Sequence, residues 1–166
     1  MKKMKFYTAL VLTLLLISCG SDDPAPVIPP TQDLDLSETT IWTGPTIVFQ
    51  KSSGGDPSAA ENRDVITPNV IITRGNSGGQ IYNAASENSA NKNTSPAGTL
   101  WARGTTDNLQ NLEFSTFRGT LAKPKDNVGV NLVLLLVEDN IALDITFTSW
   151  SQQEAGGFAY ERSSME

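Results

Sequence analysis

The hydrophobic pattern after residue 40 is that of β-strands. Residues 131–137 form a continuous apolar run, which is typical of a central strand covered on both faces. Residues 141–148 alternate between apolar and polar, and one face collects Ile141, Leu143, Ile145 and Phe147. Between the two segments, Asp139 and Asn140 tolerate positive φ and favour a tight turn. The pattern therefore predicts a β-hairpin.

Shorter strand patterns occur at residues 46–51, 69–74, 80–83, 99–103 and 157–162. The pattern breaks between Asp107 and Ala122, where rough helical spacing predicts one short helix or an irregular crossover. Apart from 80–83, residues 75–98 carry Asn, Ser, Gly and Ala with little to bury, which predicts a long loop. We expect an all-β fold, an antiparallel β-sandwich of either jelly-roll or immunoglobulin-like topology.

The N-terminus has the features of a secretory signal. Lys2, Lys3 and Lys5 precede an apolar stretch at residues 9–17, which is too short to be a transmembrane helix. Its end, Leu-Ile-Ser-Cys at residues 16–19, resembles the lipobox of bacterial lipoproteins. The resemblance implies that residues 1–18 are removed and that Cys19 carries lipid, a covalent membrane anchor. The alternative is an ordinary signal peptide with a chance cysteine.

The residues after Cys19 bear on location. Ser21, Asp22 and Asp23 resemble the short acidic export signal of Bacteroidota surface lipoproteins, which implies an outer-membrane protein that faces the cell exterior. The periplasmic face of the same membrane is the alternative. Residues 19–39 are rich in Pro and acidic residues and predict an extended tether, with the sandwich domain at 40–166. Alternatively, Leu34 and Leu36 pack on the domain.

Composition removes most catalytic chemistry. The 166 residues include no His and one Cys, which excludes a Ser-His-Asp triad, a Cys-His pair and an internal disulfide. The net charge of −6 argues against a nucleic-acid partner. Catalysis would have to rely on carboxylates, and no spacing along the chain establishes a pair of them. We therefore expect no enzymatic activity.

Two segments near the C-terminus carry a family resemblance. They read Ile-Thr-Phe-Thr-Ser-Trp at 145–150 and Gly-Gly-Phe-Ala-Tyr-Glu-Arg at 156–162, and further matches lie upstream at 64–67, 72–76, 95–99 and Trp101. Together they resemble an uncharacterised family of secreted β-domains found on Bacteroidota lipoproteins. The resemblance implies fold and location but no activity. Where members of that family carry a central-strand His, this chain has leucines at 134–136.

Aromatic side chains are the first candidates for a binding site. Sugar-binding sandwiches stack exposed aromatic rings on pyranose rings, and the candidates here are Trp42, Tyr82, Trp101, Trp150 and Tyr160. The alternative is that these residues form core, since Trp is highly buried on average. If strand alternation continues past residue 148, Trp150 lies on the face opposite Phe147. Tyr160 and Arg162 share a face, which favours either stacking or a hydrogen-bond network.

Oxygen ligands are the second set. Asp56, Glu61, Asn62 and Asp64 fall within nine residues, and such a loop could supply several ligands to Ca²⁺. The alternatives are an acidic solvated loop, or a pair between Asp64 and Arg63 or Arg74. We expect no other cofactor. These features lead to two hypotheses: a non-catalytic binding module for a glycan or surface partner, or a structural accessory subunit of an outer-membrane complex.

Overall fold

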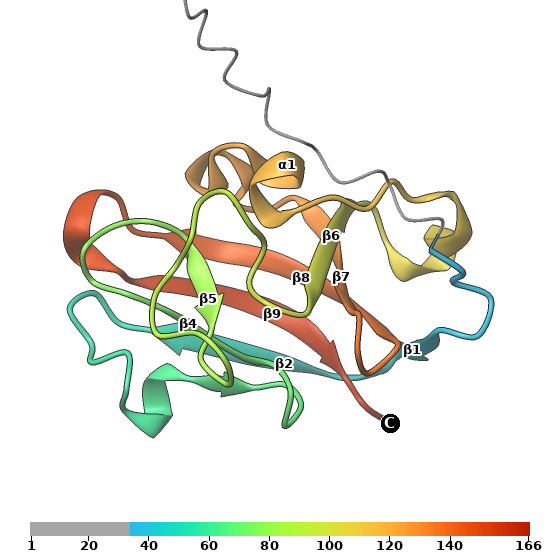
Figure 1. Ribbon diagram of the computed structural model, residues 1–166, viewed down its shortest axis with the longest axis horizontal. Helices are drawn as coiled ribbons and strands as arrows, with labels where there is room; N and C mark the ends of the chain where they lie inside the picture. Colours follow the sequence, from blue (N-terminus) through green and yellow to red (C-terminus); the bar gives the residue numbers. More distant parts are fainter. Residues whose placement is uncertain (1–33) are drawn as a thin grey trace, which may run out of the picture. The chain divides into compact units, whose positions relative to one another are not determined.

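A six-stranded sheet forms the larger layer of the fold (Figure 1). The computed structural model describes residues 34–166, so the signal peptide, Cys19 and most of the predicted tether lie outside the described residues. Four consecutive strands form an antiparallel meander: β6 (Thr99–Arg103), β7 (Asn131–Leu136), β8 (Ile141–Trp150) and β9 (Phe158–Ser164). β2 (Gly44–Lys51) pairs with β9, and β1 (Thr40–Trp42) runs parallel to the first residues of β8. This is the strand order that the sequence left open.

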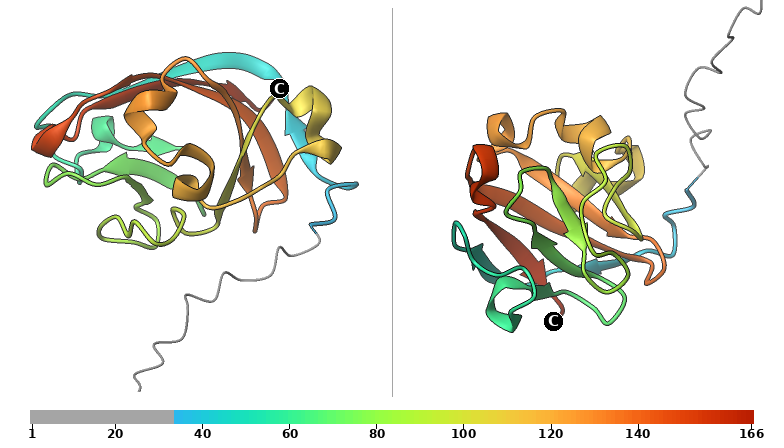
Figure 2. Two further views of the ribbon diagram at one scale, coloured as in Figure 1. Left: turned by 90° about the horizontal axis from the view of Figure 1, so that it is seen from above. Right: turned by 60° about the vertical axis from the view of Figure 1, so that its left-hand side comes forward.

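A second, three-stranded antiparallel sheet contains β3 (Asp64–Val65), β4 (Ile71–Arg74) and β5 (Ile81–Asn83). It lies on one side of the larger sheet (Figure 2). The main core fills the space between the sheets and joins Val70, Ile72 and Ile81 to Leu134 and Phe147. The predicted all-β sandwich is therefore confirmed.

The predicted hairpin is β7–β8. Asn140 has a φ of 50°, and the register pairs Leu136 with Ile141. Successive β7 side chains point into opposite layers: Leu134 joins the main core, whereas Val133 and Leu135 join a second apolar cluster. The continuous apolar run thus reflects a strand that is buried on both faces.

The second cluster lies against the other face of the sheet and includes Leu36, Leu109 and Ala142. Leu34 packs against it as well. The packed part of the chain begins before residue 40, because these two leucines cover apolar surface of β7 and β8. The alternative in which they pack on the domain is the one observed.

The remaining elements are short. One α-helix, α1 (Phe117–Leu121), begins where Thr116 accepts a hydrogen bond from the Gly119 amide. Four 3₁₀ turns accompany it: η1 (Ala60–Asn62), η2 (Thr106–Asn111), η3 (Pro124–Asn127) and η4 (Gln153–Ala155). The predicted short helix between residues 107 and 122 is confirmed, and η2 occupies the first part of that segment.

The segment 75–98 buries more than its composition suggests. Gln80, Ile81 and Asn83 are each no more than 1% exposed. The side-chain amide of Gln80 donates to the carbonyl oxygens of Asn91 and Thr94. The buried residues are those of the predicted strand at 80–83, and the amides of Gln80 and Asn83 satisfy backbone groups that no strand pairs.

Candidate functional site

A pocket opens where the end of β4, the α1–η3 segment and the β8–β9 connection meet. Its volume is about 240 Å³. Trp150 and polar residues of the β8–β9 connection line it. Four cationic side chains complete the lining: Arg74, Arg118, Lys123 and Lys125. None of its described lining residues is acidic. We call it the Arg74 pocket.

Arg74 is the last residue of β4 and is 2% exposed. Its Nη1 donates to the carbonyl oxygen of Gly157 at 2.8 Å, and to the carbonyl oxygen and Oγ of Ser151 at 3.1 and 3.3 Å. The guanidinium carbon lies 4.1 Å from the centroid of the Trp150 ring, a cation–π contact. Within residues 34–166, Nε is buried without an acceptor, and Nη2 has no hydrogen bond either.

Among residues 34–166, the charge of Arg74 has no anionic partner. No carboxylate among the described residues lies within 4.0 Å of its guanidinium nitrogens. Burial, together with repulsion from Arg118, lowers the pKa of Arg74 to about 10. Burial also lowers the pKa of Arg118, whose Nε donates to Oε1 of Gln80. Both groups remain cationic at neutral pH, so the pocket carries uncompensated positive charge.

Two glycines let the β8–β9 connection approach this charge. Gly156 has a φ of +66°, and a Cβ there would lie 2.6 Å from the carbonyl oxygen of Gly75. A Cβ on Gly157 would lie 2.9 Å from the backbone nitrogen of Ser53. Lys51, which is 1% exposed, donates from Nζ to the Gly156 carbonyl at 3.3 Å. Consecutive carbonyls of this connection thus accept hydrogen bonds from two buried cations, Lys51 and Arg74.

Trp150 lies on the side of β8 opposite to the predicted one. The β8–β9 register shifts between Phe147 and Ser149, so two residues, Thr148 and Ser149, are exposed in succession. This bulge returns Trp150 to the face of Phe147, with ring centroids 5.5 Å apart. Alternation fails here because an extra residue is inserted.

The other aromatic candidates pack within the fold. Trp101 and Tyr160 are fully buried and Tyr82 is 5% exposed, so these three rings cannot stack on an external sugar. The core interpretation is the correct one for Trp101 and Tyr160, which belong to the main core between the sheets. Tyr82 belongs to neither apolar cluster and lines a separate pocket beside the β4–β5 connection. Trp42 is half-buried against the main core. Trp150, also half-buried, lines the Arg74 pocket.

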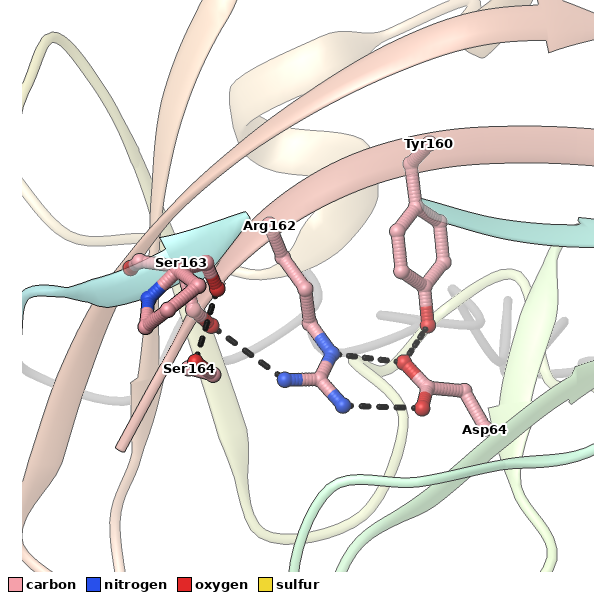
Figure 3. Close-up of polar contacts among 6 residues, drawn as sticks. Asp64, Tyr160, Arg162, Ser163 and Ser164 are labelled. Atoms are coloured by element: carbon pink, nitrogen blue, oxygen red, sulfur yellow. Dashed lines mark hydrogen bonds and ion pairs between the residues drawn. The ribbon is translucent and has the colours of Figure 1, made fainter. Parts of the chain in front are cut away.

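Asp64 forms a buried cluster with Tyr160 and Arg162 (Figure 3). Arg162 donates from Nε to Oδ2 at 2.7 Å and from Nη2 to Oδ1 at 2.9 Å, and the Tyr160 hydroxyl donates to Oδ2 at 2.6 Å. Burial and the negative charge of Asp64 raise the pKa of Tyr160 well above its ordinary value. The suggested pairing of Asp64 with Arg63 or Arg74 is wrong, because the register of β9 brings Arg162 to it. The hydrogen-bond network suggested for Tyr160 and Arg162 is confirmed.

Three of the four residues considered for Ca²⁺ have separate roles: Asp56, Asn62 and Asp64. Oδ1 of Asp56 accepts from the backbone nitrogen and hydroxyl of Ser58, and these two bonds lower the pKa of Asp56. Asn62 donates to the Asp56 carbonyl, and both oxygens of Asp64 are engaged. Over residues 34–166, no cluster of three or more His, Cys, Asp or Glu side chains could hold a metal.

Adding millimolar Ca²⁺ is therefore expected to leave the melting temperature of the protein unchanged relative to a sample in EDTA. The carboxylate of Asp64 would have to give up Arg162 to bind the ion, which would leave a buried guanidinium unpaired. Differential scanning calorimetry measures this directly. A rise in melting temperature that Asp56→Asn abolishes would restore the calcium hypothesis.

The sequence indicated the position of the pocket only in part. Arg74 lies within residues 72–76 and Trp150 ends residues 145–150, two segments of the family resemblance. Arg118, Lys123 and Lys125 carried no pattern that singled them out. They come from a segment that folds over the end of the sandwich, so their proximity to Arg74 depends on the fold.

Comparisons of the chain with protein families, with curated proteins and with solved structures find no match. Within residues 34–166, no helix has the length and apolar character needed to cross a membrane.

Proposed function

We propose that this protein is a lipid-anchored outer-membrane protein, displayed on the cell exterior, whose β-domain is a non-catalytic glycan-binding module. The Arg74 pocket is the binding site. One observation carries the proposal: a pocket combines a half-buried tryptophan with two donors of Arg74, Nε and Nη2, that have no partner among residues 34–166.

The size of the pocket indicates what it holds. Its volume of about 240 Å³ is below the range of roughly 300–1,000 Å³ that encloses a drug-sized ligand. It therefore suits a single sugar ring or the end of a chain. Arg74 covers a face of Trp150, so the ring supports the guanidinium rather than serving as an open stacking surface. The lack of lining carboxylates supports a role in binding rather than in glycoside hydrolysis.

Affinity electrophoresis of the full-length protein through gels that contain single polysaccharides tests this proposal. At least one polysaccharide should retard the wild type. Gln152→Ala, at an exposed lining residue, should reduce retardation several-fold, since a hydrogen bond contributes about 1 kcal/mol. Gln50→Ala is the matched control, because Gln50 is exposed on β2 and does not line the pocket. If none of the polysaccharides retards the wild type, the proposal is overturned.

The accessory-subunit hypothesis has one supporting observation. β2 is an edge strand, and its side chains Ile47 and Val48 are 38% and 67% exposed. An exposed apolar edge is a surface on which another protein could pair. Cross-linking from β2 in whole cells distinguishes the hypotheses: a single stoichiometric partner there, with no polysaccharide retarded, would favour the accessory subunit.

Cys19→Ala should release the protein from membranes. The substitution removes the thiol that the proposed lipid modifies, and the acyl chains are worth about 0.8 kcal/mol per buried CH₂. Metabolic labelling with palmitate, followed by membrane fractionation, measures both effects. The conservative control is Ser18→Ala, which retains the cysteine. Unchanged labelling of the Cys19→Ala protein would refute the assignment.

A further inference from the structure

We infer that the Arg74 pocket selects an acidic sugar, one whose carboxylate or sulfate oxygens bind the Nε–Nη2 edge of Arg74. The inference rests on the proposed function and specifies its ligand class. It follows from a comparison of two arginines in the same fold.

Arg162 shows how this protein satisfies a buried arginine. Its Nε and Nη2 form a fork that holds the two oxygens of Asp64 at 2.7 and 2.9 Å (Figure 3). Such bidentate pairs are among the strongest hydrogen bonds in proteins, because the planar guanidinium matches a planar anion.

Arg74 presents the same fork without an acceptor. Its Nη1 takes all three hydrogen bonds to the β8–β9 connection, so Nε and Nη2 have no protein partner among residues 34–166. A buried donor left unpaired costs about 1–3 kcal/mol, more when it is charged. A bound anion would remove that cost, whereas a neutral hydroxyl would offer one oxygen and no charge.

The surroundings favour an anion in the same way. Arg118 faces the pocket with neutral partners only, the side chain of Gln80 and the carbonyl of Ala122. Lys123 and Lys125 add two exposed ammonium groups at the rim. Asp126 lies 4.0 Å from Lys125, and it does not line the pocket. In a chain of net charge −6, this concentration of cations marks one location for an acidic ligand.

Access to the Nε–Nη2 fork requires a side-chain rearrangement. Nε is shielded from solvent, so an incoming oxygen displaces the atoms that cover it. Side-chain rearrangements of this scale are common at binding sites. Gln152 and Gln153 line the pocket and are exposed, so their side chains are free to change rotamer.

The NMR resonances of the arginine Nε–H groups report directly on the fork, because their chemical shifts change when an anion binds. The chain has five arginines, so these signals can be assigned by substitution: Arg63, Arg74, Arg103, Arg118 and Arg162. The full-length protein in detergent is titrated separately with two matched pairs of sugars. In the first pair, galacturonate is compared with its neutral methyl ester, and in the second, glucose 6-sulfate is compared with glucose. In each pair, the acidic sugar should shift the Arg74 signal and the neutral sugar should not. The Arg162 signal should stay in place as an internal control.

Two sets of variants complete the test. Arg74→Lys keeps the charge but removes the fork, and should weaken binding of the acid by about tenfold or more. Lys123→Gln with Lys125→Gln alters exposed residues only, so it should fold normally and weaken binding several-fold at low salt. Lys92→Gln, at an exposed lysine that does not line this pocket, should have no effect.

The outcomes separate the inference from the proposed function. A shift of Arg74 by either acid, absent with its neutral counterpart and reduced by the variants, supports the inference. Equal shifts with acid and neutral sugar, or no shift with either acid, overturn it. If a neutral polysaccharide is still retarded in a Gln152-dependent manner, the glycan-binding function stands and only the anionic selectivity fails. If no polysaccharide binds, both fail.

Discussion

Asp64→Asn is expected to lower the free energy of unfolding by about 3–5 kcal/mol, the range for removing one partner of a buried ion pair. Asp64 and Arg162 are 7% and 4% exposed, so the arginine left behind stays desolvated without a counter-charge. The pair also joins β3 of the small sheet to β9 of the large one (Figure 3). Urea denaturation measures the change, and the melting temperature should fall on the order of 10 °C or more.

Asp107→Asn is the matched control, because Asp107 is exposed in η2 and its substitution should stay within about 0.5 kcal/mol of the wild type. Combining Asp64→Leu with Arg162→Met should cost less than the sum of the single substitutions, since neither charge is then left alone. Equal stability of Asp64→Asn and Asp107→Asn would contradict the role assigned to the pair.

Trp101→Ala should cost about 3–5 kcal/mol, as expected for a large aromatic removed from a packed core. The Trp101 ring is fully buried, and its centroid lies 5.0 Å from that of Phe117 and 6.1 Å from that of Phe147. Its Nε1 also donates to Oγ1 of Thr99 at 3.1 Å. Denaturation curves measure the loss in the free energy of unfolding. If the alanine variant does not fold, Trp101→Phe is measured in its place.

Trp101→Phe retains an aromatic ring and should cost less than Trp101→Ala. Val48→Ala, at a side chain that is 67% exposed, should change stability by no more than about 0.5 kcal/mol. A Trp101→Ala protein that keeps wild-type stability yet no longer binds a polysaccharide would return Trp101 to the binding site and contradict its place in the core.

Most of the strands could be predicted because their signal is local. The alternation in β8 and the apolar run in β7 follow from the two-residue period of a strand and from burial on one or both faces. The hairpin turn at Asn140 is equally local. Where the local rule is interrupted, prediction fails, and the bulge before Trp150 shows this because one inserted residue reverses the face.

The candidate site was much less predictable. Arg74 and the lysines at 123 and 125 are far apart along the chain, and no periodicity links them. Their meeting depends on how α1 and η3 fold over the end of the sandwich. Asp64 and Arg162 are separated by 98 positions, and only the pairing of sheets selected this arginine over Arg63 or Arg74.

By itself, the sequence determined the all-β class, the positions of the main strands and the hairpin, since each depends on side-chain alternation between near neighbours. It also supplied the lipobox resemblance on which the proposed membrane anchor rests. Tertiary structure alone decided which charges are paired. Two arginines of similar local context differ in that β9 brings Arg162 to a carboxylate, whereas β4 brings Arg74 to carbonyl oxygens and a tryptophan ring. Ion pairing depends on distance in space, and a strand pattern carries no information about it.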